Sequence, residues 1–392
     1  MKKTQVIFHP STELYGADRI MVLAAKANAD FETVIFVPKD GPLLDFIREN
    51  LPKADVIIAP EMPVIQRSLF SVKGIATTLK NMRIFSSLIR DAVPDHEGVM
   101  YYVNTLACSF VLPLLRRKKG KVLTHVHEII DNPAIVAKAT AKLALRYSDK
   151  VICVSQAVAN GILKRTKDSN NKIEVLHNGI LPVECDHQSH QDLNFYLFGR
   201  MKPEKGQWYL IEALSQIPKA QLKGAQFHLV GGPVQGKEEM LDDLKSRIQE
   251  NRLNDIVHLH GFTNDITGHM AQADVCLIPS LMKDPFPTTV LEAMSAKKVV
   301  ITTNHGGAKE AIVDQESGFL INPDNPKQFA KAILHCIHEQ NNLQQIGQNA
   351  KNRYEQLFTQ EHFFDKWKVM TSDLLFPIWE NQTQIQTVRT AE

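Results

Sequence analysis

Two cationic side chains in a short glycine-bounded segment, Arg200 and Lys205, could together hold a phosphate group. The segment Gly199–Gly206 follows an apolar run at 194–198 that is typical of a buried strand, and it precedes a helix-length stretch. Glycine permits the tight turn that a strand end requires. A guanidinium can donate two parallel hydrogen bonds to phosphate oxygens, and an ammonium adds a point charge. The pair could therefore neutralise a departing diphosphate without a metal ion; the alternative is that both cations are solvated in a surface turn.

Two acidic side chains, Asp284 and Glu292, bracket a second informative segment and are separated by seven residues. The segment follows the apolar run 275–278, and parallel sheets bind ligands at the carboxyl ends of such strands. A helix start there would offer backbone N–H groups to a phosphate, and the carboxylates could accept hydrogen bonds from sugar hydroxyls. The residues expected to line this donor site are Phe286, Thr288, Thr289, Val290 and Glu292. The alternative is that Asp284 caps the helix and Glu292 is solvated.

Other strand ends carry residues that a reaction could use. Gly16 follows the strand expected at 5–8 and would let a ligand approach the backbone closely. His125 and His127 alternate along a strand and share a face, but two histidines are too few for a zinc site, and no metal is expected. We expect His125 to pack in the core and His127 to hydrogen-bond a sugar hydroxyl. Glu310 follows a later pair of glycines, and a structural role in a helix explains it as well as a role in ligand binding does.

The elements that must position these residues are short apolar strands alternating with helix-length segments. Strands are expected at 5–8, 33–37, 55–59, 99–103, 121–125, 150–154 and 172–176, and then at 194–198, 226–230, 257–260, 274–278, 298–302 and 318–321. Runs that are apolar on both faces are typical of parallel strands covered by helices on both sides. The polar segment 181–193 is interpreted as a linker. The sequence therefore predicts an α/β chain with two doubly wound domains, at 1–185 and 192–361, followed by an aromatic helix at 362–380.

Length and composition support this division and exclude some functions. The chain has 392 residues, which exceeds the size at which single cores stop growing, roughly 250–300 residues. Lys+Arg 45 against Asp+Glu 43 leaves a formal charge of +2, which argues against a bulk nucleic-acid binder. The 5 cysteines are scattered and odd in number, which indicates a reducing cytoplasm rather than a disulfide framework. No apolar stretch approaches the ~20 residues that a membrane-spanning helix needs.

These motifs, in this order, closely resemble those of glycosyltransferase family 4, which has the GT-B fold of two Rossmann-like domains facing each other across a cleft. The resemblance implies that Arg200 and Lys205 hold the diphosphate of a nucleotide-sugar donor. It also implies that Glu292 binds the ribose and that Asp284 contacts the transferred sugar. Asp284 stands where glutamate is usual, and Pro287 stands where glycine is common, so the identity of the donor sugar stays open.

The same resemblance extends to other parts of the chain. Gly16 and His127 match the family's glycine loop and active-site histidine, and Phe262 lies in the part that lines the nucleobase. The aromatic helix resembles the one that crosses back onto the first domain. The implied activity is metal-independent transfer with retention, from a nucleotide-diphosphate sugar to a saccharide or lipid-linked acceptor. Bacterial cell-surface polysaccharide synthesis is the implied setting, with no cofactor and no nucleic-acid partner.

A basic amphipathic segment at 72–90 and a basic run at 116–121 suggest peripheral contact with the cytoplasmic face of the inner membrane. The alternative, which we expect first, is a helix that packs on its own sheet and leaves a solvated charged face.

Two other functions stay open at this point. A non-hydrolysing sugar-nucleotide epimerase would share this architecture, although it lacks this arrangement of cations and paired acids. A catalytically silent homologue acting as a partner subunit would explain the departures at Asp284 and Pro287. The sequence leaves undecided the nucleotide base, the sugar, the acceptor, the linkage position, the oligomeric state and whether the protein associates with a membrane.

Overall fold

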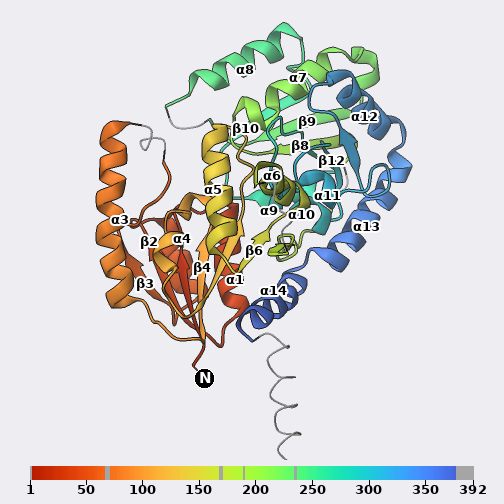
Figure 1. Cartoon of the computed structure of the whole chain (residues 1–392). Coiled ribbons are helices and arrows are strands. Elements are labelled where there is room, and N and C mark those ends of the chain that lie inside the picture. The colour runs from red at the N-terminus through yellow and green to blue at the C-terminus, as the bar shows by residue number, and fades with distance from the viewer. Residues whose placement is uncertain (1, 67–70, 167–170, 189, 234–235, 377–392) are drawn as a thin grey trace, which may run out of the picture. The chain divides into compact units, whose positions relative to one another are not determined.

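The chain forms two compact units, one of residues 1–179 with 360–392 and one of residues 180–359. The computed structural model describes residues 2–66, 71–166, 171–188, 190–233 and 236–376. Both units are parallel α/β sheets with helices on their faces (Figure 1). Each strand predicted from the apolar runs is present, to within one residue at either end.

The sheet of the first unit has seven parallel strands in the order β3-β2-β1-β4-β5-β6-β7. They are β1 (Thr4–Phe8), β2 (Glu32–Val37), β3 (Asp55–Ile58), β4 (Val99–Asn104), β5 (Lys121–Val126), β6 (Lys150–Cys153) and β7 (Ile173–Val175). The helices are α1 (Gly16–Ala27), α2 (Pro42–Asn50), α3 (Val72–Ala92), α4 (Leu112–Leu115), α5 (Ala134–Tyr147), α6 (Gln156–Thr166) and α14 (Gln360–Leu375), with the short 3₁₀-helix η2 (Leu106–Cys108). The strand order reverses at β1 and β4, so the carboxyl ends of those two strands form the switch point where ligands bind in such sheets.

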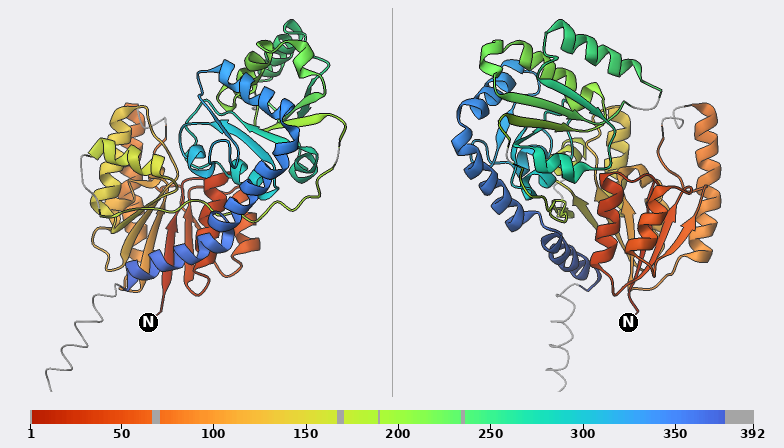
Figure 2. Two further views of the ribbon diagram at one scale, coloured as in Figure 1. Left: turned by 90° about the vertical axis from the view of Figure 1, so that its right-hand side faces the viewer. Right: turned by 180° about the vertical axis from the view of Figure 1, so that it is seen from behind.

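The C-terminal helix α14 belongs to the core of this first unit. It lies beside α1 in Figure 1 and in the rear view of Figure 2. Its buried residues Phe363, Trp367 and Leu374 pack with residues of α1 and β4 in one hydrophobic cluster. The aromatic helix predicted at 362–380 thus begins at Gln360, and its last part, 377–380, lies outside the described residues.

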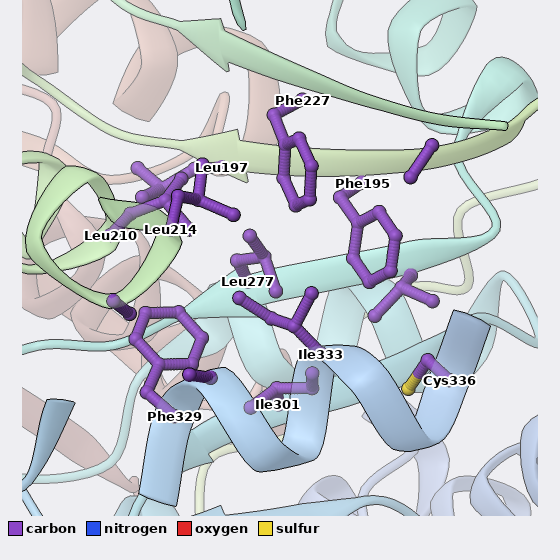
Figure 3. Close-up of a cluster of buried hydrophobic side chains, with 14 of the residues drawn as sticks. Phe195, Leu197, Leu210, Leu214, Phe227, Leu277, Ile301, Phe329, Ile333 and Cys336 are labelled. Atoms are coloured by element: carbon purple, nitrogen blue, oxygen red, sulfur yellow. The ribbon is translucent and has the colours of Figure 1, made fainter. Parts of the chain in front are cut away.

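The second unit repeats the design with six parallel strands in the order β10-β9-β8-β11-β12-β13. They are β8 (Leu193–Phe198), β9 (Ala225–Val230), β10 (Val257–Gly261), β11 (Val275–Ile278), β12 (Val299–Thr303) and β13 (Phe319–Ile321). The helices are η3 (Pro203–Lys205), α7 (Gln207–Ser215), η4 (Lys219–Leu222), α8 (Glu239–Glu250), α9 (Ile266–Gln272), α10 (Thr288–Ser295), α11 (Ala308–Ala311), α12 (Pro326–His338) and α13 (Gln340–Leu357). Figure 3 shows Phe195, Phe227 and Leu277 of the strands packed with Phe329 and Ile333 of α12 in its core.

The boundary between the units falls earlier than the predicted domain end at 185. Ile180 already pairs with Thr359 in a parallel bridge, and its N–H donates to the carbonyl oxygen of Phe358 at 3.1 Å. Farther along, the N–H of Val183 donates to the Ser295 hydroxyl at 3.0 Å. The polar segment that begins at Leu181 therefore belongs to the second unit and is tied to it at Val183, which composition alone does not reveal.

Helix α3 is amphipathic as predicted, but only its C-terminal half is buried. Phe85 and Ile89 are fully buried, and the Phe85 ring packs edge-on against Phe8 of β1. In the N-terminal half, Ile75 and Leu79 are 51% and 63% exposed. The interpretation as a helix packed on its own sheet therefore holds for the second half. Within the described residues, no helix combines the length and apolar character needed to cross a bilayer.

Candidate functional site

The carboxyl ends of β8 and β11 bring together the two motifs that the sequence singled out. The ammonium group of Lys205 lies 3.2 and 3.3 Å from the two carboxylate oxygens of Asp284, although 79 residues separate them. Asp284 is buried to 8% exposure, whereas Lys205 is half-buried and Arg200 is exposed. Lys205 thus reaches the acid-bracketed segment, as the sequence required for a phosphate site.

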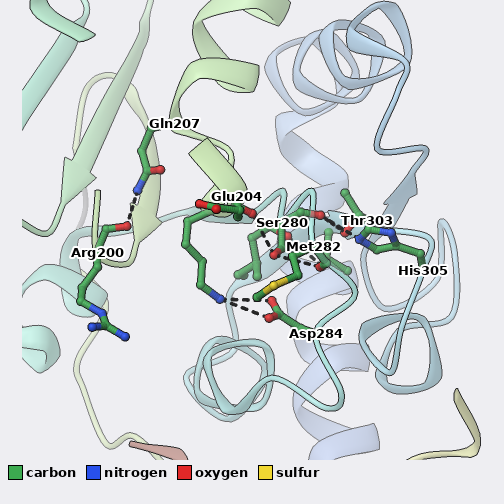
Figure 4. A network of polar contacts seen from close by, with 11 residues as sticks. Arg200, Glu204, Gln207, Ser280, Met282, Asp284, Thr303 and His305 are labelled. Atoms are coloured by element: carbon green, nitrogen blue, oxygen red, sulfur yellow. Dashed lines mark hydrogen bonds and ion pairs between the residues drawn. The ribbon is translucent and has the colours of Figure 1, made fainter. Parts of the chain in front are cut away.

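Backbone and hydroxyl contacts fix these two loops against each other, as Figure 4 shows. The carbonyl oxygen of Glu204 accepts the Ser280 hydroxyl at 3.1 Å and the N–H of Leu281 at 2.9 Å. On the other side, the amide of Gln207 donates to the carbonyl oxygen of Arg200 at 3.1 Å. His305 Nε2 lies 2.9 Å from the carbonyl oxygen of Ser280, which can only accept, so this ring nitrogen carries the proton. The cations are therefore mounted on a rigid frame.

Two glycines allow the loops to approach this closely. Gly206 has φ of 89°, and a Cβ there would collide with the carbonyl oxygen of Pro279. Gly306 has φ of 59°, and a Cβ there would collide with the carbonyl oxygen of Asp284. The neighbouring Gly307 N–H donates to that same Asp284 oxygen at 2.8 Å. Both sites thus combine a left-handed backbone with contact against another backbone, which only glycine satisfies.

Replacement of Gly206 by alanine should destabilise the second unit through both effects. Gly224 is a matched control because its φ of 79° is also left-handed while no atom lies within 4 Å of an added Cβ. Gly224→Ala should cost only the left-handed strain, about 1–2 kcal/mol. Gly206→Ala should lower the free energy of unfolding, measured by urea titration, by clearly more. Equal losses in the two variants would show that the close approach at Pro279 is not a constraint.

The start of α10 separates the predicted donor residues into two groups. Thr288, Thr289 and Glu292 are partly exposed, so a ligand can reach their side chains. Phe286 and Val290 are buried, with exposed fractions of 4% and 0%; the Phe286 ring centroid lies 5.5 Å from that of Phe358. Their side chains belong to the core, so any contact with a ligand would come from their backbone. The Val290 N–H already donates to the carbonyl oxygen of Pro287 at 3.3 Å.

Phe262 supplies an exposed aromatic face beside the glycine loop after β9. It directly follows β10, and its side chain is 77% exposed. A Cβ on Gly232 would lie 3.3 Å from the Phe262 Cβ, so glycine keeps the two loops close. The N–H of Gly231 donates to the carbonyl oxygen of Gly261 at 2.7 Å. An exposed ring on a fixed loop suits a planar base.

The first unit carries a polar network at its own switch point, and His127 is part of it. The His127 Nε2 lies 3.0 Å from Asn104 Oδ1, and the Asn104 amide nitrogen lies 2.8 Å from His9 Nδ1. His9 Nε2 in turn lies 2.7 Å from a carboxylate oxygen of Asp18. Burial lowers the pKa of His127 to about 3, so the ring is neutral at physiological pH. Gly16, which opens α1 two residues before Asp18, has open space around it.

Sequence reasoning missed three members of this network: His9, Asp18 and Asn104. His9 follows β1 directly, and Asn104 ends β4, so a polar residue after a fully apolar run was the available signal. The prediction that His125 packs in the core is confirmed, since it is fully buried and its ring centroid lies 5.2 Å from that of Trp367.

The backbone is strained beside this network. Thr105 has φ of 70° and ψ of 153°, a conformation that is rare for a β-branched residue. Its N–H donates to the carbonyl oxygen of His125 at 2.8 Å, and its hydroxyl accepts the N–H of Ala107 at 3.2 Å. The Glu128 carboxylate accepts the N–H groups of Leu106 and His127, each at 3.1 Å. These bonds hold the turn in place despite its cost, and such strain concentrates at functional sites.

Comparison with known proteins gives the same division of the chain. A family model described as glycosyl transferases group 1 matches residues 186–353, and one described as glycosyltransferase family 4 matches residues 21–182. An Escherichia coli UDP-Gal:alpha-D-GlcNAc-diphosphoundecaprenol alpha-1,3-galactosyltransferase is 24% identical over 89% of this chain and 90% of its own. An uncharacterised glycosyltransferase of Methanocaldococcus jannaschii is 27% identical over 71% of this chain and 76% of its own.

Solved structures agree with the fold. The Anabaena protein Alr3699/HepE, solved in complex with UDP, superposes with a TM-score of 0.79 at 22% identity, covering 95% of this chain and 100% of that one. The sucrose-phosphate synthase of Thermosynechococcus elongatus gives a TM-score of 0.74 at 19% identity over 95% of this chain and 99% of its own. The fold and the two matched regions define the class: an enzyme of the GT-B glycosyltransferases. Within that class, the chain belongs to glycosyltransferase family 4.

Proposed function

We propose that this enzyme transfers a sugar from a nucleotide-diphosphate donor, with retention of anomeric configuration, to a saccharide or lipid-linked acceptor of a bacterial cell-surface polysaccharide. The single observation that carries the donor assignment is the contact of Lys205 with Asp284, which places a cation at the acid-bracketed helix start. Arg200 follows the neighbouring strand β8, and α10 begins with Thr288 and Thr289, whose backbone N–H groups stand at a helix start and have no intrahelical acceptor. Two cations and a helix start suit a leaving diphosphate.

The chemistry that follows needs no metal ion. Negative charge develops on the departing phosphate oxygens, and Lys205 and Arg200 would supply the positive charge that stabilises it. Asp284 is already paired with Lys205, so its carboxylate is engaged and is not a free general base. The acceptor hydroxyl would therefore pass its proton to a leaving phosphate oxygen on the face that the donor vacates, which gives retention. Chelation by EDTA should leave the transfer rate unchanged.

The donor base is proposed to be uracil. The relative from Escherichia coli is named for UDP-Gal, and the Anabaena structure was solved with UDP. The exposed Phe262 beside Gly232 offers a surface for a pyrimidine ring. A thermal-shift comparison of UDP-, GDP-, ADP- and dTDP-sugars tests this choice, since a ligand at 100 times its Kd adds about 2.7 kcal/mol of stability.

Phe262→Ala should weaken binding of UDP. Stacking of a base on an aromatic ring is worth about 1–3 kcal/mol by alanine substitution, so Kd should rise roughly 5- to 150-fold. Isothermal titration calorimetry with UDP measures the change. Phe376→Ala is the matched control, because that ring is also exposed, at 42%, but lies at the end of α14 in the first unit. An unchanged Kd for Phe262→Ala would place the base elsewhere.

The acceptor is proposed to be lipid-linked, because the Escherichia coli relative is named for a diphosphoundecaprenol acceptor. Incubation of the enzyme with the UDP-sugar that binds and a set of diphosphoprenol-linked and free saccharides tests transfer directly. NMR of the product's anomeric proton then tests retention. Inversion at the anomeric carbon would contradict the mechanism, and an epimerised nucleotide sugar formed without any acceptor would contradict the proposed function.

A further inference from the structure

A single chain of hydrogen bonds runs from a carboxylate to His127 in the first unit. Asp18 lies on α1, His9 follows β1, Asn104 ends β4 and His127 follows β5. The three contacts between them measure 2.7, 2.8 and 3.0 Å. Asp18, His9 and Asn104 are buried, with exposed fractions of 3%, 0% and 0%, so water does not replace any of these partners.

The protons along this chain are determined by its first member. The carboxylate of Asp18 only accepts, so His9 Nε2 must donate to it. The Asn104 amide nitrogen lies 2.8 Å from His9 Nδ1 and can only donate, so Nδ1 is an acceptor and Nε2 carries the one ring proton. This orientation of the amide leaves Asn104 Oδ1 facing His127, and an amide oxygen only accepts. His127 must therefore carry its proton on Nε2.

A side branch of the network obeys the same assignment. The Tyr102 hydroxyl lies 2.9 Å from Asn104 Oδ1 and 3.0 Å from His125 Nδ1. Since it donates its one proton to Asn104, it must accept from His125 Nδ1–H. His125 Nε2 is then a bare lone pair, and this atom is buried with no partner among the described residues. With this assignment, the one unpaired nitrogen of His125 is an acceptor, and no buried N–H group of this ring lacks a partner.

We propose that Asp18, His9 and Asn104 are positioning residues that fix His127 as the Nε2–H tautomer, so that its Nδ1 presents a lone pair to a hydroxyl of the substrate. The placement of His127 at the reaction centre rests on the proposed function. His127 retains 9% exposure, and the described residues provide no partner for Nδ1, which is not among the fully buried unpaired atoms. The ring is an acceptor for a sugar hydroxyl rather than a proton donor.

Asp18→Asn tests the relay because the amide that it introduces has a determined orientation. The Tyr15 N–H donates to the other carboxylate oxygen of Asp18 at 2.7 Å, so the amide oxygen of the variant stays there and the amide nitrogen faces His9. His9 must then accept at Nε2 and donate from Nδ1, which turns the Asn104 amide around. The Asn104 nitrogen then donates to His127 Nε2, and the His127 proton moves to Nδ1.

Ring ¹⁵N shifts of histidine-labelled full-length protein report the tautomer directly, and a His127→Gln variant assigns the signals. We expect Nε2–H in the wild type, Nδ1–H in Asp18→Asn, and Nε2–H in Tyr102→Phe, which removes only the side branch. Asp45→Asn changes an exposed carboxylate in the first turn of α2, so it is the matched control and should leave the tautomer unchanged. A wild-type Nδ1–H tautomer, or an Asp18→Asn protein that keeps Nε2–H, would overturn the proposal.

Activity separates this inference from the proposed function. Loss of one neutral hydrogen bond to the substrate should lower kcat/KM of Asp18→Asn about tenfold, with unchanged thermal stability. A tautomer that switches while kcat/KM stays at the wild-type value would refute the positioning role. If the wild type shows the expected tautomer but transfers no sugar from any nucleotide donor, the proposed function fails while the proton relay stands.

Discussion

Lys205→Ala should lower kcat by roughly 10²–10³, equivalent to about 2.7–4 kcal/mol, which is the cost of removing one donor aimed at developing charge. The lysine is held by Asp284 at 3.2 Å on a loop that Ser280 and Gln207 tie down, so no neighbouring cation can take its position without breaking that frame. Arg200→Ala should cause a loss of the same order. Steady-state kinetics with the UDP-sugar donor measures both.

The control for these variants is Lys219→Ala. Lys219 lies in η4, which precedes β9 and therefore stands at the amino edge of the same sheet, opposite the donor loops. The Lys219→Ala substitution removes the same charge from the same unit, and its turnover should stay at the wild-type value. Turnover near the wild type in both Arg200→Ala and Lys205→Ala would refute the role of these cations. A loss confined to KM would show that they bind the ground state and transition state equally.

Trp367→Ala should be strongly destabilising, with a loss of about 3–5 kcal/mol in the free energy of unfolding of the first unit. Trp367 is fully buried, and its ring centroid lies 5.3 Å from that of Tyr102 and 5.8 Å from that of Phe363. Removal leaves a large cavity between α14 and the sheet. Denaturant unfolding followed by near-ultraviolet circular dichroism measures the change.

Two further variants serve as controls for this result. Val369→Ala lies on the same helix, but the side chain is 60% exposed, so it should change stability by less than about 0.5 kcal/mol. Trp367→Phe keeps an aromatic ring and removes an indole N–H that is buried without a partner in the described part of the chain, so it should cost less than Trp367→Ala. If Trp367→Ala were as stable as Val369→Ala, α14 would not be an integral part of this core.

The pattern of neighbouring residues was sufficient to predict the strands and to find the motifs of the donor site. The runs at β8 and β11 are apolar on both faces because helices cover both sides of a parallel sheet, and this requirement is written into consecutive residues. Arg200, Lys205 and Asp284 were recognisable for a related reason, since a ligand at a strand end needs its charged groups within a few residues of that end.

The polar network in the first unit was not recognisable in this way. His9, Asp18 and Asn104 are single polar residues with no diagnostic spacing, and their partners lie as far as 95 residues away in the chain. Phe286 and Val290 show the opposite error: the sequence motif predicted that they line the donor site, but their side chains are buried in the core. Burial depends on which elements pack together, which no short segment specifies.

By itself, the sequence determined two α/β domains, the order of their elements and the cations and acids at the strand ends, because alternation of apolar runs and end-of-strand chemistry are local properties. Only the tertiary structure decided that Lys205 meets Asp284, that 181–193 belongs to the second unit and that α14 completes the core of the first. It also decided which ring nitrogen of His127 carries the proton, because a proton's position follows from a chain of partners contributed by four separate elements.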